Sequence, residues 1–133
     1  MKLMKITITF PHPDRALSLN GQVPLKARAA VVCNRKRVAL KGATRRAAYL
    51  EAMKVLNYMP QRNFPAKELE VFWYYKGKMP DVDNVVTRLK PLIDGCCQAF
   101  GIDDREIELG RVRRMHTLGE KAGKVDLIFD TVL

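Results

Sequence analysis

Five aspartates lie between Asp81 and Asp104, in the segment DVDNVVTRLKPLIDGCCQAFGIDD, although the whole chain of 133 residues has a formal net charge of +10. Carboxylates held about 4 to 6 Å apart repel each other, so a bound cation or a raised pKa must relieve the repulsion. Mg²⁺ and Mn²⁺ prefer oxygen ligands, and Mg²⁺ often uses one or two carboxylates together with a substrate phosphate. On a basic chain, this segment indicates metal-dependent phosphodiester hydrolysis.

The spacing of the aspartates suggests how they could meet. Asp81 and Asp83 follow an expected strand and Pro80, and residues two apart in an extended segment point the same way. Asp103 and Asp104 come after an expected helix. We therefore expect Asp81, Asp83 and one of the later pair to converge on one metal ion. The alternative is structural, because Asp83 or its neighbour Asn84 is also a good N-cap for the helix.

An amphipathic helix is predicted between these acidic ends. Its apolar stripe continues past Pro91, so we expect the proline to kink the helix, at a cost of about 3 kcal/mol or more, and not to end it. Asp83, Thr87, Lys90 and Asp94 fall within about 60° on the side away from the stripe. Lys90 could place positive charge near a scissile phosphate. The stripe comprises Val85, Val86, Leu89, Leu92, Ile93, Cys96, Cys97 and Phe100.

The basic residues are concentrated in the first half of the chain. Residues 1–66 contain 13 Lys and Arg and two acids, whereas residues 67–133 contain 11 and 12. Such an excess suits a polyanion, because neutralising phosphates releases condensed counterions. A solvated basic surface is the alternative. The predicted DNA-binding residues are Arg28, Arg35, Lys36, Arg37, Lys41, Arg45 and Arg46.

Local patterns predict a single α+β domain over residues 1–133. Residues 4–10, 68–76, 105–117 and 124–133 have strand patterns, with a bulge expected at Gly110. Residues 27–59 are helical with an interruption at Gly42, so they form one helix with a break or two helices. The order β-α-β-α-β-β predicts a small mixed four-stranded sheet with helices packed on one face.

Other features limit the location and the cysteine chemistry. No apolar run approaches the roughly 20 residues of a membrane helix, and the alternating start is unlike a signal peptide, so we expect a cytoplasmic protein with no membrane partner. Cys33, Cys96 and Cys97 have no CxxC spacing and lie far from both histidines. We therefore expect free thiols, with neither a zinc site nor a disulfide framework.

The motif PDVDN, the helix with Lys90 and IDG, and GIDDREIE before a strand resemble the RusA family of Holliday junction resolvases. These are small endonucleases often found in phages and prophages. LSLNG after FPHP is also similar to that family's N-terminal loop. The resemblance implies a homodimer that uses Mg²⁺ or Mn²⁺ to cut four-way DNA junctions by paired nicks. It places the family's DxD on Asp81 and Asp83, and its DD pair on Asp103 and the catalytic Asp104.

The lysine departs from the family pattern. The family usually has a lysine four residues after the second aspartate, where this chain has Thr87, and another aspartate four residues after that lysine. Lys90 instead lies four residues before Asp94, which matches the later part of the pattern. Three extra residues move Lys90 about 4.5 Å along the helix axis. The sequence leaves open whether Lys90 or Thr87 occupies the family's lysine position.

The predicted function is that of a Mg²⁺-dependent, structure-specific endodeoxyribonuclease that resolves Holliday junctions in DNA recombination and repair. Asp81, Asp83 and Asp104 would bind metal, Asp103 or Asp94 would support them, and Lys90 would assist at the phosphate. One alternative is a non-catalytic nucleic-acid-binding module whose aspartates only cap a helix and pair with arginines. Another is a nuclease for flaps or other branched DNA.

Overall fold

A computed structural model of the chain describes residues 4–14, 17, 27–57 and 64–131, without the side chains of residues 27–34. The described elements are β1 (Lys5–Pro11), α1 (Ala27–Asn57), β2 (Glu68–Tyr75), α2 (Val82–Phe100), the short 3₁₀ helix η3 (Asp104–Glu106), β3 (Glu108–His116) and β4 (Lys124–Asp130). This order confirms the predicted α+β fold class.

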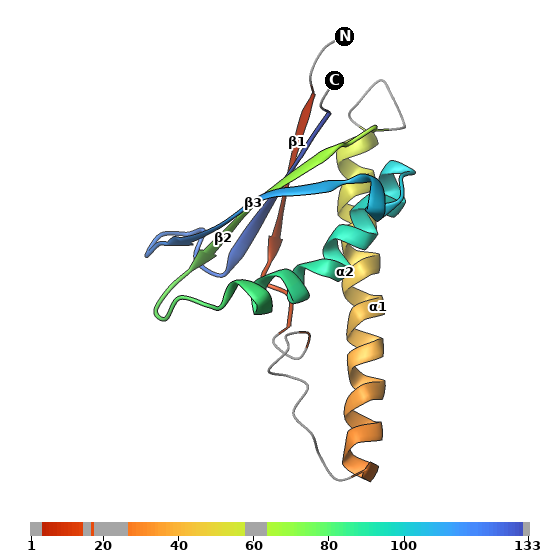
Figure 1. Cartoon of the computed structure of the whole chain (residues 1–133), viewed down its shortest axis with the longest axis vertical. Coiled ribbons are helices and arrows are strands. Elements are labelled where there is room, and N and C mark those ends of the chain that lie inside the picture. Colours follow the sequence, from red (N-terminus) through yellow and green to blue (C-terminus); the bar gives the residue numbers. More distant parts are fainter. Residues whose placement is uncertain (1–3, 15–16, 18–26, 58–63, 132–133) are drawn as a thin grey trace.

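The four strands form one mixed sheet in the order β1-β4-β2-β3 (Figure 1). β4 is antiparallel to both β1 and β2, whereas β3 is parallel to β2. A parallel pair needs a crossover that carries the chain back along the sheet, and α2 provides it. The residues before α2 and the residues after it therefore lie at opposite ends of the sheet.

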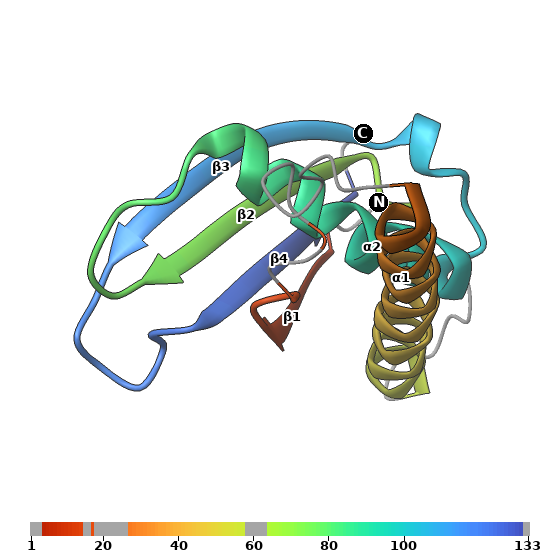
Figure 2. The same ribbon diagram turned by 90° about the horizontal axis from the view of Figure 1, so that it is seen from below.

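The core lies between one face of the sheet and the two helices, which pack against each other (Figure 2). Alternate strand residues point into it, as the period of two in the sequence predicts. Trp73 is its largest fully buried side chain and is 1% exposed. The sheet contributes Ile6, Ile8, Phe10, Leu69, Val71, Trp73, Val125, Leu127 and Phe129 to this core.

α1 is a single helix of 31 residues that runs through Gly42 without interruption. The expected break at Gly42 is wrong. Glycine in a helix costs only about 1 kcal/mol relative to alanine, which is too little to interrupt a helix whose later turns bury Ala48, Ala52 and Leu56.

α2 continues through Pro91, as predicted, and its two halves run in different directions in Figure 1. Its end is set by Gly101, which has a left-handed backbone with φ of 74°. The N–H of Gly101 donates to the Gln98 carbonyl at 3.3 Å, and the N–H of Ile102 donates to the Cys97 carbonyl at 3.1 Å. These bonds satisfy carbonyl groups that the last turn leaves without helical partners.

Two further details position the site. A Cβ atom at Gly95 of α2 would lie 2.2 Å from the Arg45 carbonyl oxygen, so this glycine permits the close approach of α1. In β3 the register moves from Leu69 opposite Leu109 to Val71 opposite Val112, which confirms the bulge predicted at Gly110.

Among the described helices, none is long and apolar enough to cross a membrane.

Candidate active site

α2 separates the five aspartates into two groups. Asp81 is the N-cap and Asp83 lies in the first turn, whereas Asp103 and Asp104 follow the last turn. Asp83 and Asp94 are separated by about 16 Å along the helix axis, at 1.5 Å per residue. We call Asp81 and Asp83 the N-terminal pair, and Asp94, Asp103 and Asp104 the C-terminal group.

The two groups do not meet within one chain. Among the residues that the structure describes, no three His, Cys, Asp or Glu side chains are close enough together to hold a metal ion. The expected convergence of Asp81, Asp83 and one of Asp103 and Asp104 is therefore not found in a single copy. The physical reason is the parallel pairing of β2 and β3, because the crossover helix spans the length of the sheet.

Within the C-terminal group, Asp94 and Asp104 form a close pair. Partial burial raises the pKa of Asp94, and the charge of Asp104 and a hydrogen bond with it raise this pKa further. The positive charges of Lys90 and of Arg45 on α1 act in the opposite direction. Ionising Asp94 here therefore costs free energy, through its burial and through the neighbouring Asp104 carboxylate, and a proton or a bound cation would relieve that cost.

The buried thiol of Cys97 lies near the carboxylates of the C-terminal group. Burial raises the pKa of its thiol to about 12, with the negative charges of Asp104, Asp94 and Asp103 adding to the effect. Cys97 is thus a neutral, buried thiol at neutral pH. Cys96 and Cys97 are free thiols, as predicted, and the side chain of Cys33 lies outside the described residues.

Asp103 is engaged by its own neighbour. Its carboxylate accepts hydrogen bonds from the Arg105 guanidinium at 2.8 Å and from the Arg105 backbone N–H at 2.9 Å. These bonds hold the pKa of Asp103 well below its ordinary value. Asp103 is also the N-cap of η3. This side chain would have to exchange its arginine partner for a metal ion before it could act as a ligand.

Lys90 and Thr87 have different surroundings on α2. Lys90 is exposed, and its charge acts on Asp94 one turn later. The Thr87 hydroxyl instead donates to the Asp83 carbonyl of the same helix at 2.8 Å. The Lys90 charge therefore acts on the C-terminal group, whereas the Thr87 hydroxyl is bonded within its own helix.

The N-terminal pair is exposed at the start of α2. Asp81, and not Asp83 or Asn84 as expected, is the N-cap, because the helix already begins at Val82. The Asp81 side chain makes no capping hydrogen bond. Arg114 of β3 holds the loop before α2, because its guanidinium donates to the Pro80 carbonyl at 3.0 Å. A capping role therefore does not explain why position 81 carries a carboxylate side chain.

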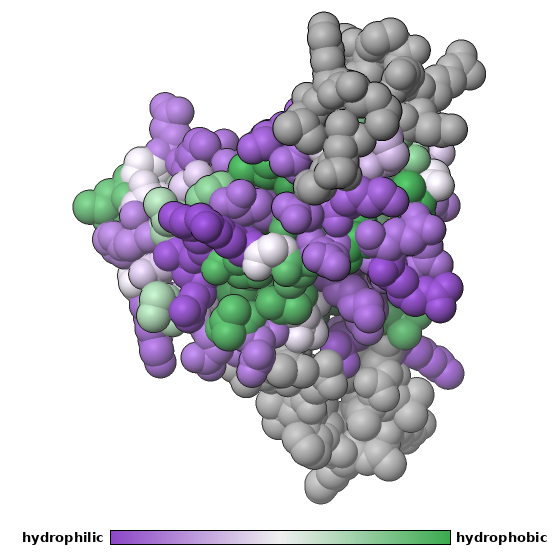
Figure 3. Space-filling view, turned by 45° about the horizontal axis from the view of Figure 1, so that its top comes forward, coloured by the Kyte–Doolittle hydropathy of each residue, from purple (hydrophilic) through white to green (hydrophobic). Residues whose placement is uncertain are grey.

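The predicted DNA-binding residues lie along α1. Arg35, Lys36, Lys41, Arg45 and Arg46 are exposed, Arg37 is half-buried, and the side chain of Arg28 lies outside the described residues. Arg45 lies near Asp94, so this basic surface adjoins the C-terminal group. Hydrophilic side chains dominate much of the face of the molecule drawn in Figure 3, around a smaller apolar area.

One cluster near α2 was not found by sequence reasoning. The His12 ring stacks on Trp73 with ring centroids 3.9 Å apart, and His12 Nε2 donates to the Lys124 carbonyl at 3.0 Å. The Arg88 guanidinium lies 4.9 Å from the Trp73 ring centroid, and its Nε donates to the Pro13 carbonyl at 2.9 Å. The Arg88 bond ties the PHP segment to α2, and the His12 contacts tie it to β2 and β4. The only local signal was the prolines that flank His12.

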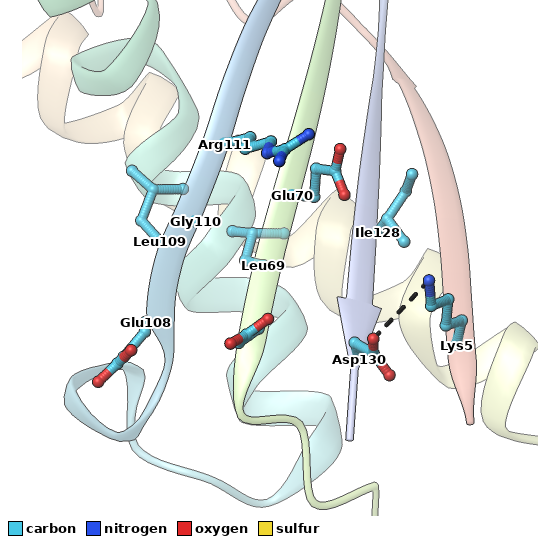
Figure 4. Close-up of a pocket in the computed structure, with 10 residues that line it drawn as sticks. Lys5, Leu69, Glu70, Glu108, Leu109, Gly110, Arg111, Ile128 and Asp130 are labelled. Atoms are coloured by element: carbon cyan, nitrogen blue, oxygen red, sulfur yellow. Dashed lines mark ion pairs between the residues drawn. The ribbon is translucent and has the colours of Figure 1, made fainter. Parts of the chain in front are cut away.

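A shallow hollow of about 200 Å³ lies elsewhere, over the starts of β2 and β3 (Figure 4). Glu68, Glu70 and Glu108 line it, together with Asp130, which pairs with Lys5 at 3.9 Å. None of the five aspartates of the acidic segment lines this hollow.

Comparisons with protein-family models, curated proteins and solved structures find no match to this chain. The resemblance to the RusA family therefore depends chiefly on the motif residues between Pro80 and Glu106.

Proposed function

We propose that this chain is a metal-dependent endodeoxyribonuclease that cleaves branched DNA. The four-way Holliday junction is the substrate that the RusA resemblance implies. The observation that carries the proposal is the Asp94 and Asp104 carboxylate pair beside Lys90 and Arg45, at the point where α2 meets the basic helix α1. A cation site next to a phosphate-binding surface is the arrangement that phosphodiester hydrolysis needs.

The donor set of the C-terminal group fits Mg²⁺ or Mn²⁺. Its ligand atoms are carboxylate oxygens, which hard divalent cations prefer, and two carboxylates together with a DNA phosphate are enough for Mg²⁺. Asp94 and Asp104 would hold the ion, and Asp103 could join them after releasing Arg105. A divalent cation bound there would supply neutralisation of the charge that develops on the scissile phosphate.

The other side chains would hold and orient the DNA. The exposed basic residues of α1 would contact backbone phosphates, which gives salt-dependent binding with little base readout. Lys90 would stabilise negative charge on a phosphate oxygen near Asp94. A homodimer would supply two centres for two opposed nicks in a substrate of approximate twofold symmetry.

A non-catalytic nucleic-acid-binding module remains the second candidate. The specific observation that favours it is the ion pair of Asp103 with Arg105, which is one of the aspartate-to-arginine pairings that this alternative predicts. In that case Asp94 and Asp104 would serve only to shape the surface beside α1. The two candidates differ in whether the phosphodiester bond is broken.

A cleavage assay across linear, flap and four-way DNAs separates the candidates. We expect Mg²⁺- or Mn²⁺-dependent paired nicks that are fastest on the four-way junction and are lost when EDTA is added. Faster cleavage of flaps would assign a flap nuclease. Tight junction binding without cleavage in either metal from about pH 7 to about pH 9 would favour the binding module.

A further inference from the structure

One face of the sheet carries aromatic side chains that the proposed active site does not use. Leu69, Val71 and Trp73 of β2 point into the core, so Phe72 and Tyr74 of the same strand point to the opposite face. β2 is an inner strand of the sheet, between β4 and β3. Both rings are half-buried, and they lie on the face away from α1 and α2, which we call the open face.

The charged side chains of the open face are sorted along the strands. At the starts of β2 and β3 the register places three acids in one row, Glu68, Glu108 and Asp130. They line the hollow drawn in Figure 4. Further along β2, Phe72 is instead paired with Arg113 of β3. The exposed cations around the two rings are Arg113, Lys121 and Lys124, and the exposed acid in the adjoining turn is Glu120. The near balance of acids and bases in residues 67–133 therefore conceals an acidic end and a basic end of the open face.

The acid paired with Phe72 across the sheet does not present its charge to solvent. Asp126 of β4 is 5% exposed, and its carboxylate accepts hydrogen bonds from the Thr9 hydroxyl at 2.7 Å and from the Lys121 ammonium at 3.1 Å. The same ammonium lies 5.0 Å from the centroid of the Tyr74 ring. The Lys121 side chain is nevertheless 58% exposed. A phosphate that approaches the rings therefore meets the Lys121 ammonium, while the Asp126 carboxylate is buried and paired.

Aromatic rings with cations beside them suit the bases and phosphates of an unpaired nucleic-acid strand. The Phe72 and Tyr74 rings have centroids 6.5 Å apart and planes inclined by 25°. Successive nucleotides of a stacked strand are about 3.4 Å apart, so a strand that follows these rings has to unstack, which base pairing opposes. Aromatic side chains on an open four-stranded sheet are a recurring platform for single strands. We propose that the open face binds single-stranded DNA, with a base stacked on Phe72 and with Arg113 and Lys121 against the flanking phosphates.

This surface would act separately from the proposed active site. The choice of DNA over RNA rests on the proposed function, because a nuclease for branched DNA meets an unpaired strand at a flap. α1 and the C-terminal group lie on the helical side of the sheet, so the open face would hold a strand that they do not contact. A substrate with an unpaired strand is then bound on two faces of the molecule, whereas a plain duplex is bound only along α1.

Binding to oligo(dT) of about 12 nucleotides tests the stacking, with a hairpin duplex as the second probe. Fluorescence anisotropy in EDTA requires neither metal nor cleavage. Phe72→Leu keeps an apolar side chain and removes the ring, so oligo(dT) should bind about tenfold more weakly while duplex binding stays unchanged. The matched control is Tyr75→Leu, because Tyr75 lies on the same strand and packs against the core; it should leave both affinities unchanged. Circular dichroism checks that both variants fold.

Several outcomes of this assay would overturn the inference. They are no binding of oligo(dT) by wild type up to about 100 µM, equal binding by wild type and Phe72→Leu, and an equal loss in both variants or for both probes. Oligo(rU) that binds tenfold more tightly than oligo(dT) would overturn the assignment to DNA.

Photocrosslinking locates the bound strand on the molecule. Irradiated oligo(dT) that carries 5-iodouracil should form its covalent bond with the β2 peptide that contains Phe72 and Tyr74, identified by mass spectrometry. Arg113→Ala should also lower the slope of log binding constant against log salt by about 0.7. Crosslinks confined to α1 would overturn the inference. Junction cleavage by a chain whose oligo(dT) binding ignores Phe72 would refute this inference alone, and Phe72-dependent binding without cleavage of any branched DNA would refute the proposed function alone.

Discussion

Replacing Gly95 with alanine should destabilise the protein through the contact between α1 and α2. The new Cβ would lie 2.2 Å from the Arg45 carbonyl oxygen, 2.8 Å from Ala48 Cβ and 3.0 Å from the Tyr49 backbone nitrogen. Two of these atoms belong to the α1 backbone, so no side-chain rotation relieves the overlap and the helices must separate. Such overpacking costs about 1 to 3 kcal/mol, occasionally more.

The higher helix propensity of alanine opposes this destabilisation, but it contributes less than the overlap costs. Alanine favours a helix over glycine by about 1 kcal/mol, so the net expectation for Gly95→Ala is a loss of up to about 2 kcal/mol in the free energy of unfolding. Gly42→Ala is the matched control, because its Cβ would meet only the end of the Arg46 side chain, at 3.6 Å. That variant should gain about 1 kcal/mol.

Urea unfolding monitored by circular dichroism measures both values. The two substitutions are chemically identical and both lie within helices, so their opposite signs would isolate the helix contact from helix propensity. The m-value should stay unchanged in both variants. If Gly95→Ala stabilised the protein as Gly42→Ala does, the close packing of α1 on α2 would be refuted, together with the position of Arg45 beside Asp94.

Three further predictions concern charged groups. Burial and a neighbouring carboxylate raise the pKa of Asp94. In metal-free buffer the free energy of unfolding should therefore fall as the pH rises from the ordinary aspartate pKa through the raised value. Urea titrations from about pH 4 to pH 7 measure this decrease, and Asp94→Asn should remove it. Thr9→Val removes the hydroxyl that donates to the buried Asp126 carboxylate at 2.7 Å and should cost about 1 to 3 kcal/mol, whereas Thr7→Val on the same strand should be near neutral. If α1 tracks phosphates, Lys41→Ala should reduce the slope of log binding constant against log salt by about 1 for four-way DNA, measured by fluorescence anisotropy, and an unchanged slope would remove Lys41 from the interface.

The sequence was sufficient where local pattern determines structure. Alternation of Ile6, Ile8 and Phe10 with polar residues identified β1, because a half-buried strand requires that period. The apolar stripe of α2 outweighed Pro91, since burial along the whole helix exceeds the cost of one lost hydrogen bond. Gly110 marked the bulge of β3, where two residues oppose one on β2.

The sequence was insufficient where the answer depends on long-range pairing. Nothing near Asp81 or Asp104 reveals that β2 and β3 are parallel, and this pairing places the two acidic groups at opposite ends of the sheet. The nearness of Arg45 to Asp94 depends on the helix crossing at Gly95, which joins segments about 50 residues apart. Even so, the length of α2 could have indicated that Asp83 and Asp104 do not share a metal ion within one chain.

The most direct test of the central claim is the rate of Mg²⁺-dependent nicking of a four-way junction by Asp104→Asn, compared with wild type at equal junction occupancy. We expect the variant to bind the junction normally and to lose about 100-fold or more in nicking rate. Glu106→Gln, at a neighbouring exposed carboxylate, is the matched control and should cleave like wild type. Wild-type cleavage by Asp104→Asn, or no cleavage by the unmodified chain, would contradict the proposed function.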